Sequence, residues 1–404
     1  MTERSGSSYG PRGGGAGSAD AEGARPRLLL LTPDYPPVIG GVQLLMSRIA
    51  SGVQGFDTRV LTPDSDGAAR FDATSGVGTR RVGPLARSAR GRIVGLNAIA
   101  LTEALRFRPE LVLSGHIVTS PAAALIRRAV GARTVQYFHA REIGGRPRLA
   151  AFAARQAHAR IAISTYTAGL LVPLGVSRET VTVIPPGVDL PADPRPEVAG
   201  RPTVLTIARL ADSYKGHDVL LRSLASVRER VPDVEWVVIG DGPLRPGLEA
   251  LARARGLGDS ARFLGSVSDR ERDLWLRRAD LLAMPSRLPD GGRPGEGYGI
   301  VYLEAGAHGK PVVAGNVGGP LDAVLDGETG LLVEPTDAAA VAEAITTLLL
   351  DEKLARRLGS AGAARARGLA WPAIVERVQA VLDEQLAAVR RTPRADPEAS
   401  GARR

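Results

Sequence analysis

The sequence predicts an α/β protein of two doubly wound domains that face a central cleft. Three observations support this prediction. The chain has 404 residues, which is too long for one hydrophobic core and divides naturally into two domains of about 150–190 residues. Strand-length apolar runs alternate with helix-length stretches, and this series occurs twice along the chain. A proline-rich stretch at residues 185–202 separates the two series and is the expected linker.

The first series fills residues 25–190, the predicted N-terminal domain. Its apolar runs are leucine-rich or β-branched and cover Leu28–Leu31, Arg59–Leu61, Leu111–Leu113, Thr134–Phe138 and Ile161–Ile163. The helical stretches between them include Val42–Ser51, Ile93–Arg106 and Pro121–Val130. Continuous apolar strands that alternate with helices indicate a parallel sheet covered on both faces. Residues 63–92 carry no pattern that can be interpreted.

The second series fills residues 191–370, the predicted C-terminal domain. Its expected strands are Thr203–Ile207, Glu235–Ile239, Arg262–Leu264, Leu281–Met284 and Val312–Ala314. Its expected helices include His217–Glu229, Arg245–Arg255, Ser268–Arg278, Ile300–His308 and Asp337–Leu350. Residues 371–390 form a last helix that we expect to cross back to the N-terminal domain. The start (1–24) and the end (391–404) are expected to be disordered tails.

The composition restricts the class of protein. There is no cysteine, so disulfides and thiolate metal sites are excluded. No apolar run approaches the roughly 20 residues of a membrane span, and residues 1–24 lack the apolar core of a signal peptide. We therefore expect a cytoplasmic protein.

The net charge of +9 is unevenly distributed. Residues 25–189 hold 21 Arg, no Lys and 10 acidic residues, a balance of +11 that leaves −2 for the rest. One interpretation is a solvated, arginine-rich surface, and the other is a domain that approaches an anionic membrane peripherally. Nucleic acid is not expected, because no aromatic-interleaved basic motif or zinc motif accompanies the charge. A membrane contact would use the arginines around the amphipathic run Ile93–Leu105, namely Arg80, Arg81, Arg87, Arg90 and Arg92.

Two candidate site segments follow strands of the first series, at the sheet edge where open α/β sheets bind ligands. Gly40 and Gly41 follow the first strand. Glycines let the backbone approach a phosphate or a sugar, although a simple turn would use the same pair. His139 follows the strand Thr134–Phe138, where it is either catalytic or a packing or capping residue.

Charged residues follow strands of the second series. Arg209 and Lys215 leave the first of these strands, and two cations there suit a diphosphate. Glu296 and Glu304 are separated by seven residues, after a short strand and at the opening of a helix. Free amides at a helix N-terminus attract phosphate, and carboxylates accept hydrogen bonds from sugar hydroxyls. A ligand that carries both phosphate groups and sugar hydroxyls is a nucleotide-sugar.

In their order and domain placement these segments resemble the retaining glycosyltransferases of family 4, which have the GT-B fold. The resemblance covers residues 28–382. Its most specific motifs are Ala208-Arg209-Leu210, Lys215-Gly216-His217-Asp218, Gly240-Asp241-Gly242-Pro243, Phe263-Leu264-Gly265, Met284-Pro285-Ser286 and Glu296-Gly-Tyr-Gly-Ile-Val-Tyr-Leu-Glu304-Ala305, with Pro186-Gly187-Val188-Asp189 at the linker. The first loop and the segment that starts at Gly299 look most like those of bacterial phosphatidylinositol mannosyltransferases.

The resemblance implies how the donor would be held. Arg209 and Lys215 would bind its diphosphate, joined by the backbone of Gly40, Gly41, Gly299, Ile300 and Val301. Glu304 would accept hydrogen bonds from the ribose.

The same resemblance assigns the sugar and the base. Glu296 would bind hydroxyls of the transferred hexose, and His139 would position that sugar near its C6 hydroxyl. The loop with Gly242 and the strand end at Val267 would face the base.

The resemblance also implies a chemistry. The hexose would be transferred to the same face of the sugar from which the diphosphate leaves, with the leaving phosphate accepting the proton, no metal and no cofactor. GDP-mannose is the favoured donor, while UDP-glucose, UDP-galactose and UDP-N-acetylglucosamine remain open. The acceptor is a lipid-linked molecule, a glycan or a natural product.

Two other classes compete with this interpretation. A non-catalytic nucleotide-sugar-binding protein would have lost a site cation or glutamate, and all are intact. An epimerase or a phosphorylase fits the motifs less well, because the cofactor-lysine motif of phosphorylases is missing. The sequence departs from the family pattern at residues 287–295, a longer link than usual, and at Ala140, where a polar residue is frequent.

Overall fold

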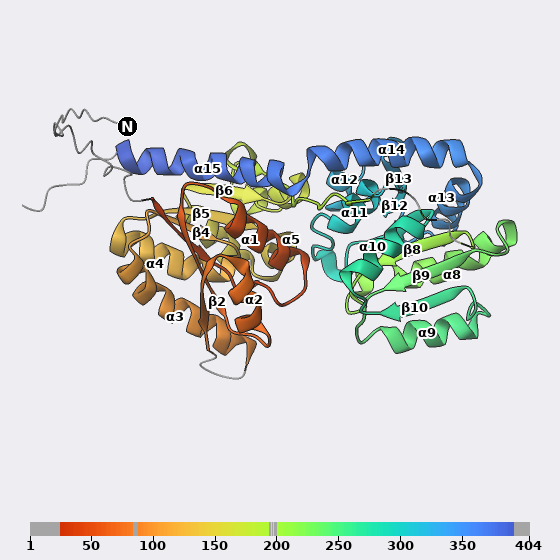
Figure 1. Ribbon diagram of the computed structural model, residues 1–404, viewed down its shortest axis with the longest axis horizontal. Helices are drawn as coiled ribbons and strands as arrows, with labels where there is room; N and C mark the ends of the chain where they lie inside the picture. Colours follow the sequence, from red (N-terminus) through yellow and green to blue (C-terminus); the bar gives the residue numbers. More distant parts are fainter. Residues whose placement is uncertain (1–24, 84–87, 194, 196, 198–199, 392–404) are drawn as a thin grey trace, which may run out of the picture.

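The computed structural model describes residues 25–391 except 84–87, 194, 196 and 198–199. The chain forms two parallel sheets, each flanked by helices, that lie side by side (Figure 1). The predicted fold class is therefore confirmed. The predicted tails fall, except for Arg391, outside the described residues.

The N-terminal sheet has seven parallel strands in the order β3-β2-β1-β4-β5-β6-β7. They are β1 (Arg27–Leu31), β2 (Asp57–Pro63), β3 (Gly78–Val82), β4 (Leu111–Ser114), β5 (Arg133–Phe138), β6 (Ala159–Ala162) and β7 (Thr182–Val183). The apolar runs predict the five inner strands, and residues 28–31 of the inner strand β1 are fully buried. The two edge strands were not predicted.

The described residues between 63 and 92 are structured although their sequence shows no clear pattern. They contain α2 (Ala68–Ser75), the edge strand β3 and the start of α3 (Ala89–Phe107). β3 reads Gly-Thr-Arg-Arg-Val, and only Val82 in it is buried. An edge strand has one neighbour and an exposed side, so it needs no continuous apolar run. This explains why periodicity misses it.

The C-terminal sheet has six parallel strands in the order β10-β9-β8-β11-β12-β13. They are β8 (Thr203–Ile207), β9 (Glu235–Ile239), β10 (Ala261–Gly265), β11 (Leu281–Met284), β12 (Val312–Gly315) and β13 (Gly330–Val333). The unpredicted strand is again at an edge. β13 is short and starts with a glycine that packs closely, because an added Cβ at Gly330 would lie 2.5 Å from the Val312 carbonyl oxygen.

Helices cover both sheets, and some of them begin at a side-chain cap. Ser268 Oγ accepts a hydrogen bond from the Glu271 N–H, and the Asp337 side chain accepts from two amides of the following turn. The remaining α-helices are α1 (Gly41–Gly52), α4 (Ser120–Val130), α5 (Ala140–Gly145), α6 (Pro147–Gln156), α7 (Thr165–Gly169), α8 (His217–Arg230), α9 (Arg245–Ala254), α10 (Asp269–Arg278), α11 (Ile300–Ala307), α12 (Pro320–Ala323), α13 (Ala338–Leu350), α14 (Glu352–Gly368) and α15 (Trp371–Arg391).

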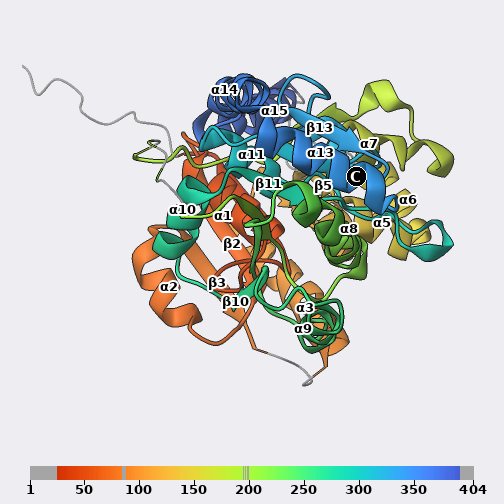
Figure 2. The same ribbon diagram turned by 90° about the vertical axis from the view of Figure 1, so that its right-hand side faces the viewer.

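The last two helices lie along one side of the molecule (Figures 1 and 2). α14 packs on α11, and α15 then crosses back to contact α1 and β5. Gln385 of α15 accepts hydrogen bonds from Arg133 at 2.8 and 2.9 Å. Trp371 starts this helix against Gly187, where an added Cβ would lie 2.6 Å from the indole ring. The chain therefore connects the two halves twice, through the linker and through α15.

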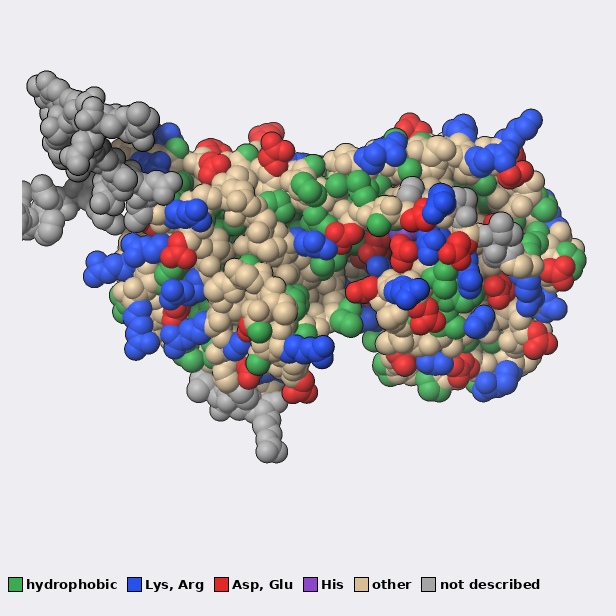
Figure 3. Space-filling view, in the orientation of Figure 1, with side chains coloured by type: hydrophobic (Ala, Val, Ile, Leu, Met, Phe, Trp, Pro, Cys, Tyr) green, Lys and Arg blue, Asp and Glu red, His purple; other side chains and the backbone are tan. Residues whose placement is uncertain are grey.

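Further contacts join the two halves beside the strand ends. The Thr165 and Tyr166 N–H groups donate to the Asp322 carboxylate at 3.2 and 3.3 Å. Gly144 of α5 lies against Pro294, where an added Cβ would come within 2.1 Å of the proline ring. The long link at residues 287–295 thus packs on the helix that follows His139. Figure 3 shows acidic and basic side chains gathered where the two halves meet.

Candidate active site

Two predicted site segments from opposite domains meet at the strand ends. An added Cβ at Gly41, the first residue of α1, would lie 3.2 Å from Cδ1 of Ile300. Gly299 has φ 94, a left-handed value that favours glycine, and it begins α11. Among the described residues no side chain caps this helix start. The amides of Ile300 and Val301 are therefore available to an anion.

Lys215 and Glu296 form a close ion pair beside this helix start. Lys215 ends a short 3-10 turn after β8, and Glu296 directly follows the long link at residues 287–295 and precedes α11. Burial favours the neutral amine, but the Glu296 charge outweighs it and raises the pKa of Lys215. Burial likewise opposes ionisation of Glu296, and Lys215 with two backbone amides lowers its pKa. Both groups are charged at neutral pH.

Glu304 on α11 forms a second pair with Arg272 on α10. The side chains are 15% and 32% exposed, so solvent reaches both. Burial would lower the pKa of Arg272, and the Glu304 charge raises it instead. The motifs did not identify Arg272 as a site residue. It lies on the first helical turn after the Ser268 cap, and a search of the turn that follows a strand end would have found it.

Arg209 differs from the other site cations because its side chain is 71% exposed. Its Nη2 lies 3.7 Å from Asp212 Oδ2. The glycine loop after β9 supports this segment, since an added Cβ at Gly242 would lie 2.5 Å from the Leu210 carbonyl. The Gly242 loop is therefore in direct contact with the Arg209 loop.

Val267, by contrast, is partly buried and packs against the core.

His139 is only 7% exposed and begins α5. Its ring stacks on Tyr137 at 5.6 Å with an interplanar angle of 13°, and Nε2 lies 3.0 Å from the Gly115 carbonyl oxygen. Burial lowers the pKa of His139, so the ring is neutral at neutral pH. Because the Gly115 carbonyl can only accept, Nε2 carries the proton. The His139 and Glu142 side chains also form a capping box at the start of α5, so a capping role is part of what His139 does.

A buried glutamate supports His139, and sequence reasoning missed it. Glu142 accepts hydrogen bonds from the His139 N–H and the Ile117 N–H, both at 2.9 Å. His116 Nδ1 lies 2.9 Å from Glu142 Oε2, the oxygen that also accepts from Ile117. Burial opposes ionisation of Glu142, but His116 lowers its pKa. A glutamate three residues after a helix-capping residue is a capping-box signal that would have identified it.

The described part of the chain contains no group of three or more His, Asp or Glu side chains that could hold a metal ion. One Asp-x-Asp pair is present, Asp64 and Asp66, in the connection between β2 and α2. Both aspartates are exposed. Metal independence was expected from the sequence partly because no Asp-x-Asp motif was recognised, and this pair shows that the premise is wrong.

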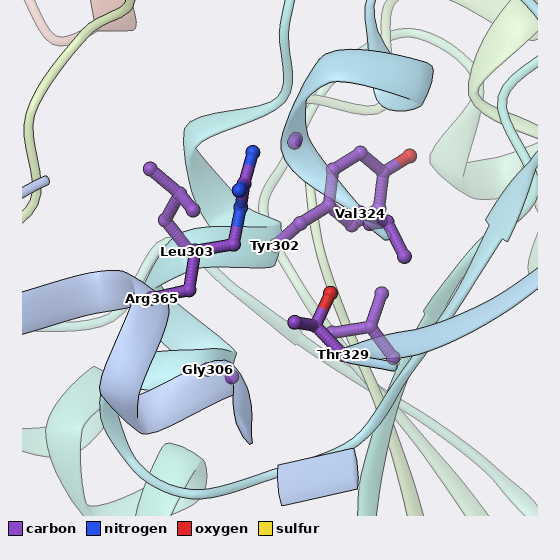
Figure 4. A pocket seen from close by; sticks show the side chains of 9 residues that line it. Tyr302, Leu303, Gly306, Val324, Thr329 and Arg365 are labelled. Atoms are coloured by element: carbon purple, nitrogen blue, oxygen red, sulfur yellow. The ribbon is translucent and has the colours of Figure 1, made fainter. Parts of the chain in front are cut away.

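A pocket behind α11 does not belong to the strand-end site. Figure 4 shows its lining, which includes Tyr302, Leu303 and Val324 together with Thr329 and Arg365. The Tyr302 hydroxyl donates to the Met284 carbonyl at 2.7 Å, and Arg365 donates to the Asp322 carbonyl at 2.6 Å. The hydrogen bonds of the lining residues are thus structural, and the pocket lies between α11, α12 and α14.

Comparisons with known proteins agree with this geometry. Residues 39–191 match the family model "Glycosyltransferase Family 4", and residues 193–365 match "Glycosyl transferases group 1". The chain is 33% identical over 368 residues to a GDP-mannose-dependent alpha-(1-6)-phosphatidylinositol monomannoside mannosyltransferase of Mycolicibacterium smegmatis, covering 83% of this chain and 92% of that protein. A protein of the same description from Mycobacterium tuberculosis is 33% identical over 371 residues, with the same coverage.

Solved structures show the same fold. Sucrose-phosphate synthase from Thermosynechococcus elongatus aligns with a TM-score of 0.76 at 23% identity, covering 90% of this chain and all of that one. HepE from Anabaena, in complex with UDP and glucose, aligns with a TM-score of 0.73 at 21% identity over 89% of this chain and 99% of its own. The chain belongs to glycosyltransferase family 4 and is a GT-B glycosyltransferase.

Proposed function

We propose that this enzyme transfers mannose from GDP-mannose to a lipid-linked inositol acceptor, with retention of configuration and without a metal. The observation that carries the proposal is the row formed by Lys215–Glu296, Arg272–Glu304 and the uncapped start of α11. The relatives that cover most of the chain are described as GDP-mannose-dependent phosphatidylinositol monomannoside mannosyltransferases. Donor and acceptor are carried over from those descriptions.

In this proposal the donor replaces the contacts that the site residues make with one another. Lys215 and Arg209 turn to the diphosphate, whose charge grows as the sugar leaves, and the amides of Ile300 and Val301 stabilise the same charge. Glu304 accepts from the ribose. Glu296 then accepts from hydroxyls of the hexose. Glu296 accepts hydrogen bonds from hydroxyls here and does not act as a nucleophile. The leaving phosphate therefore receives the proton of the acceptor's attacking hydroxyl, on the face of the sugar from which the phosphate departs.

His139 is proposed to position the reacting sugar through the edge of its ring. The stack on Tyr137 and the contact with Gly115 fix the ring's orientation. His139→Ala should therefore lower turnover of the folded protein by about 100-fold, because misplaced reactants lose that much. Circular dichroism beside a transfer assay separates this effect from a loss of folded protein. Transfer at the wild-type rate by folded His139→Ala would leave only the capping role.

The donor is tested by thermal shift with nucleoside diphosphates. A ligand at 100 times its Kd stabilises the folded protein by about 2.7 kcal/mol. We expect GDP to stabilise more than UDP, and the reverse result would support the UDP-sugar alternative. NMR of the product's anomeric proton tests retention, and transfer in excess EDTA tests metal independence.

A membrane contact is proposed for the carboxyl edge of the N-terminal sheet. Val38 and Ile39, in the loop after β1, are 50% and 90% exposed, and Val94 on α3 is 60% exposed. Arg90 and Arg92 on the same helix are also exposed. Apolar side chains beside arginines are typical of surfaces that bind anionic lipid. Such a surface would bring a lipid-linked acceptor to the cleft.

The contacts of the predicted basic cluster limit which of its arginines we propose for the membrane contact. Arg80 pairs with Glu103, and Arg81 pairs with Asp72 while it donates to the Pro36 carbonyl at 2.6 Å. Arg87 lies outside the described residues. The middle of α3 packs on the sheet through Leu96, Ala100 and Ala104, which belong to the hydrophobic core. None of the described helices combines the length and apolar character needed to cross a membrane. The contact is therefore proposed to be peripheral.

Sedimentation with anionic vesicles tests the membrane contact. Arg90→Gln with Arg92→Gln should reduce binding at low salt, because each basic residue contributes about 1 kcal/mol near such a surface. Arg253→Gln with Arg255→Gln, two exposed arginines of the C-terminal domain, is the matched control. Wild-type protein left in the supernatant would indicate a soluble acceptor.

A further inference from the structure

Arg141 of the N-terminal domain reaches the loop of the C-terminal domain that carries Arg209 and Lys215. It lies on the first turn of α5, two residues after His139. Its Nη1 is 3.0 Å from Oδ1 of Asp212, which lies between Arg209 and Lys215 in the chain. No sequence motif marks Arg141, because its partner Asp212 belongs to the other domain.

Arg141, Arg209 and Lys215 lie close together where the two domains meet. Two side chains, Asp212 and Tyr214, link these three cations. Asp212 receives Arg141 on one oxygen and Arg209, at 3.7 Å, on the other. The Tyr214 ring lies 5.5 Å from the guanidinium carbon of Arg141 and 5.5 Å from Nζ of Lys215. Glu296 is the partner of Lys215. Two carboxylates thus face three cations, an arrangement that favours one further anion.

A purely structural role accounts poorly for Arg141. Its side chain is 55% exposed, and ion pairs with that much solvent access contribute little to stability. The contact with Asp212 is made by one guanidinium nitrogen. The other nitrogen donors of the planar guanidinium suit the oxygens of a phosphate.

We propose that Arg141 is a third cation of the donor diphosphate site, contributed by the N-terminal domain. This rests on the proposed donor role of Arg209 and Lys215. When the diphosphate is bound, Arg141 contacts the phosphate next to the sugar and stabilises the charge that develops as the sugar leaves. Because α5 also begins at His139, the same helix brings the phosphate contact and the sugar-positioning residue to the donor together.

Calorimetric titration of the full chain tests the proposal. The probes are GDP and UDP, each paired with its monophosphate, and the more tightly bound pair is used. Arg141→Ala should weaken the diphosphate by about tenfold or more, the effect of losing a hydrogen bond between charged groups. The affinity of this variant for the monophosphate should change by less than about twofold. Arg148→Ala, an exposed arginine of α6, is the control and should change neither, while Arg141→Lys should recover part of the loss.

Asp212→Asn distinguishes a phosphate contact from a brace between the domains. If Arg141 binds the phosphate, this variant should bind the diphosphate as tightly as the wild type or more tightly, because both arginines are released. If Arg141 acts only through Asp212, the variant weakens the diphosphate as much as Arg141→Ala, which overturns the inference. Equal diphosphate affinity in Arg141→Ala and wild type also overturns it and leaves the donor site intact. A wild-type protein that binds neither diphosphate overturns the donor assignment itself.

Discussion

The two domains use glutamates at their strand ends in opposite ways. In the C-terminal domain Glu296 and Glu304 each meet a cation from another element, and both pairs keep contact with solvent. In the N-terminal domain the Glu142 side chain is 2% exposed, and its partners are two backbone amides and His116. Carboxylates that a ligand can take over must stay accessible, whereas a carboxylate that fixes a loop is enclosed. Substitutions should therefore affect binding in one domain and stability in the other.

The largest effect is expected for Glu142→Ala. Removing this carboxylate leaves His116 and two amides without their partner, and breaking a buried ion pair typically costs about 3–5 kcal/mol. Urea denaturation should show this loss in the free energy of unfolding. Glu110→Ala is the matched control, because Glu110 accepts one hydrogen bond, from the Arg27 N–H, and is partly exposed. Similar losses in the two variants would contradict the contrast between enclosed and accessible carboxylates.

Lys215→Met should act mainly on chemistry. Losing a group that stabilises developing charge lowers turnover by about 100–1000-fold. The single variant should also lower the melting temperature, since the Glu296 side chain, which is only 15% exposed, loses its cation. Adding Glu296→Gln should restore the melting temperature and leave turnover low. Recovery of turnover in the double variant would show that the pair is structural.

The two accessible glutamates should separate binding from turnover. Glu304→Ala should weaken the free nucleoside diphosphate by roughly 1.5–3 kcal/mol, because a charged hydrogen bond to the ribose is lost. Glu296→Ala should lower turnover with nearly unchanged diphosphate affinity. Titration calorimetry beside a transfer assay measures both quantities. Unchanged nucleotide affinity in Glu304→Ala would remove the ribose assignment.

The smallest effect concerns pH. Burial would lower the pKa of His116, but Glu142 outweighs it and raises the pKa above the ordinary value of 6.5. The stabilising contribution of a charged His116 is therefore complete below pH 6.5 and is lost as pH rises through the folded-state pKa. The charged and titratable groups around this site are Asp34, His139, Glu142 and Arg146.

A His116→Gln variant isolates this contribution. Denaturation curves of wild type and variant are compared from about pH 6 to about pH 9. Because the other groups are common to both proteins, the stability difference between them should shrink as pH rises. A difference that stays constant over this range would mean that His116 is neutral in the folded protein.

Strand ends were predictable, and the contacts between them were not. Apolar runs marked the inner strands, since a strand buried on both faces must be apolar over its whole length. β3, β7 and β13 were not predicted, because these edge strands are short or carry polar side chains. Candidate site residues follow from the same logic, since the carboxyl ends of parallel strands meet at one edge.

The two doubly wound sheets, the family and the segments that carry the site could all be predicted from the sequence. These depend on local pattern and on residue type at a strand end. Which charges meet could be seen only in the folded protein. Glu296 pairs with a lysine 81 residues away and Glu304 with an arginine 32 residues away, and Arg141 crosses to Asp212 of the other domain. Such pairs depend on register, on loop path and on how the two sheets face each other, which are long-range properties that no local pattern encodes.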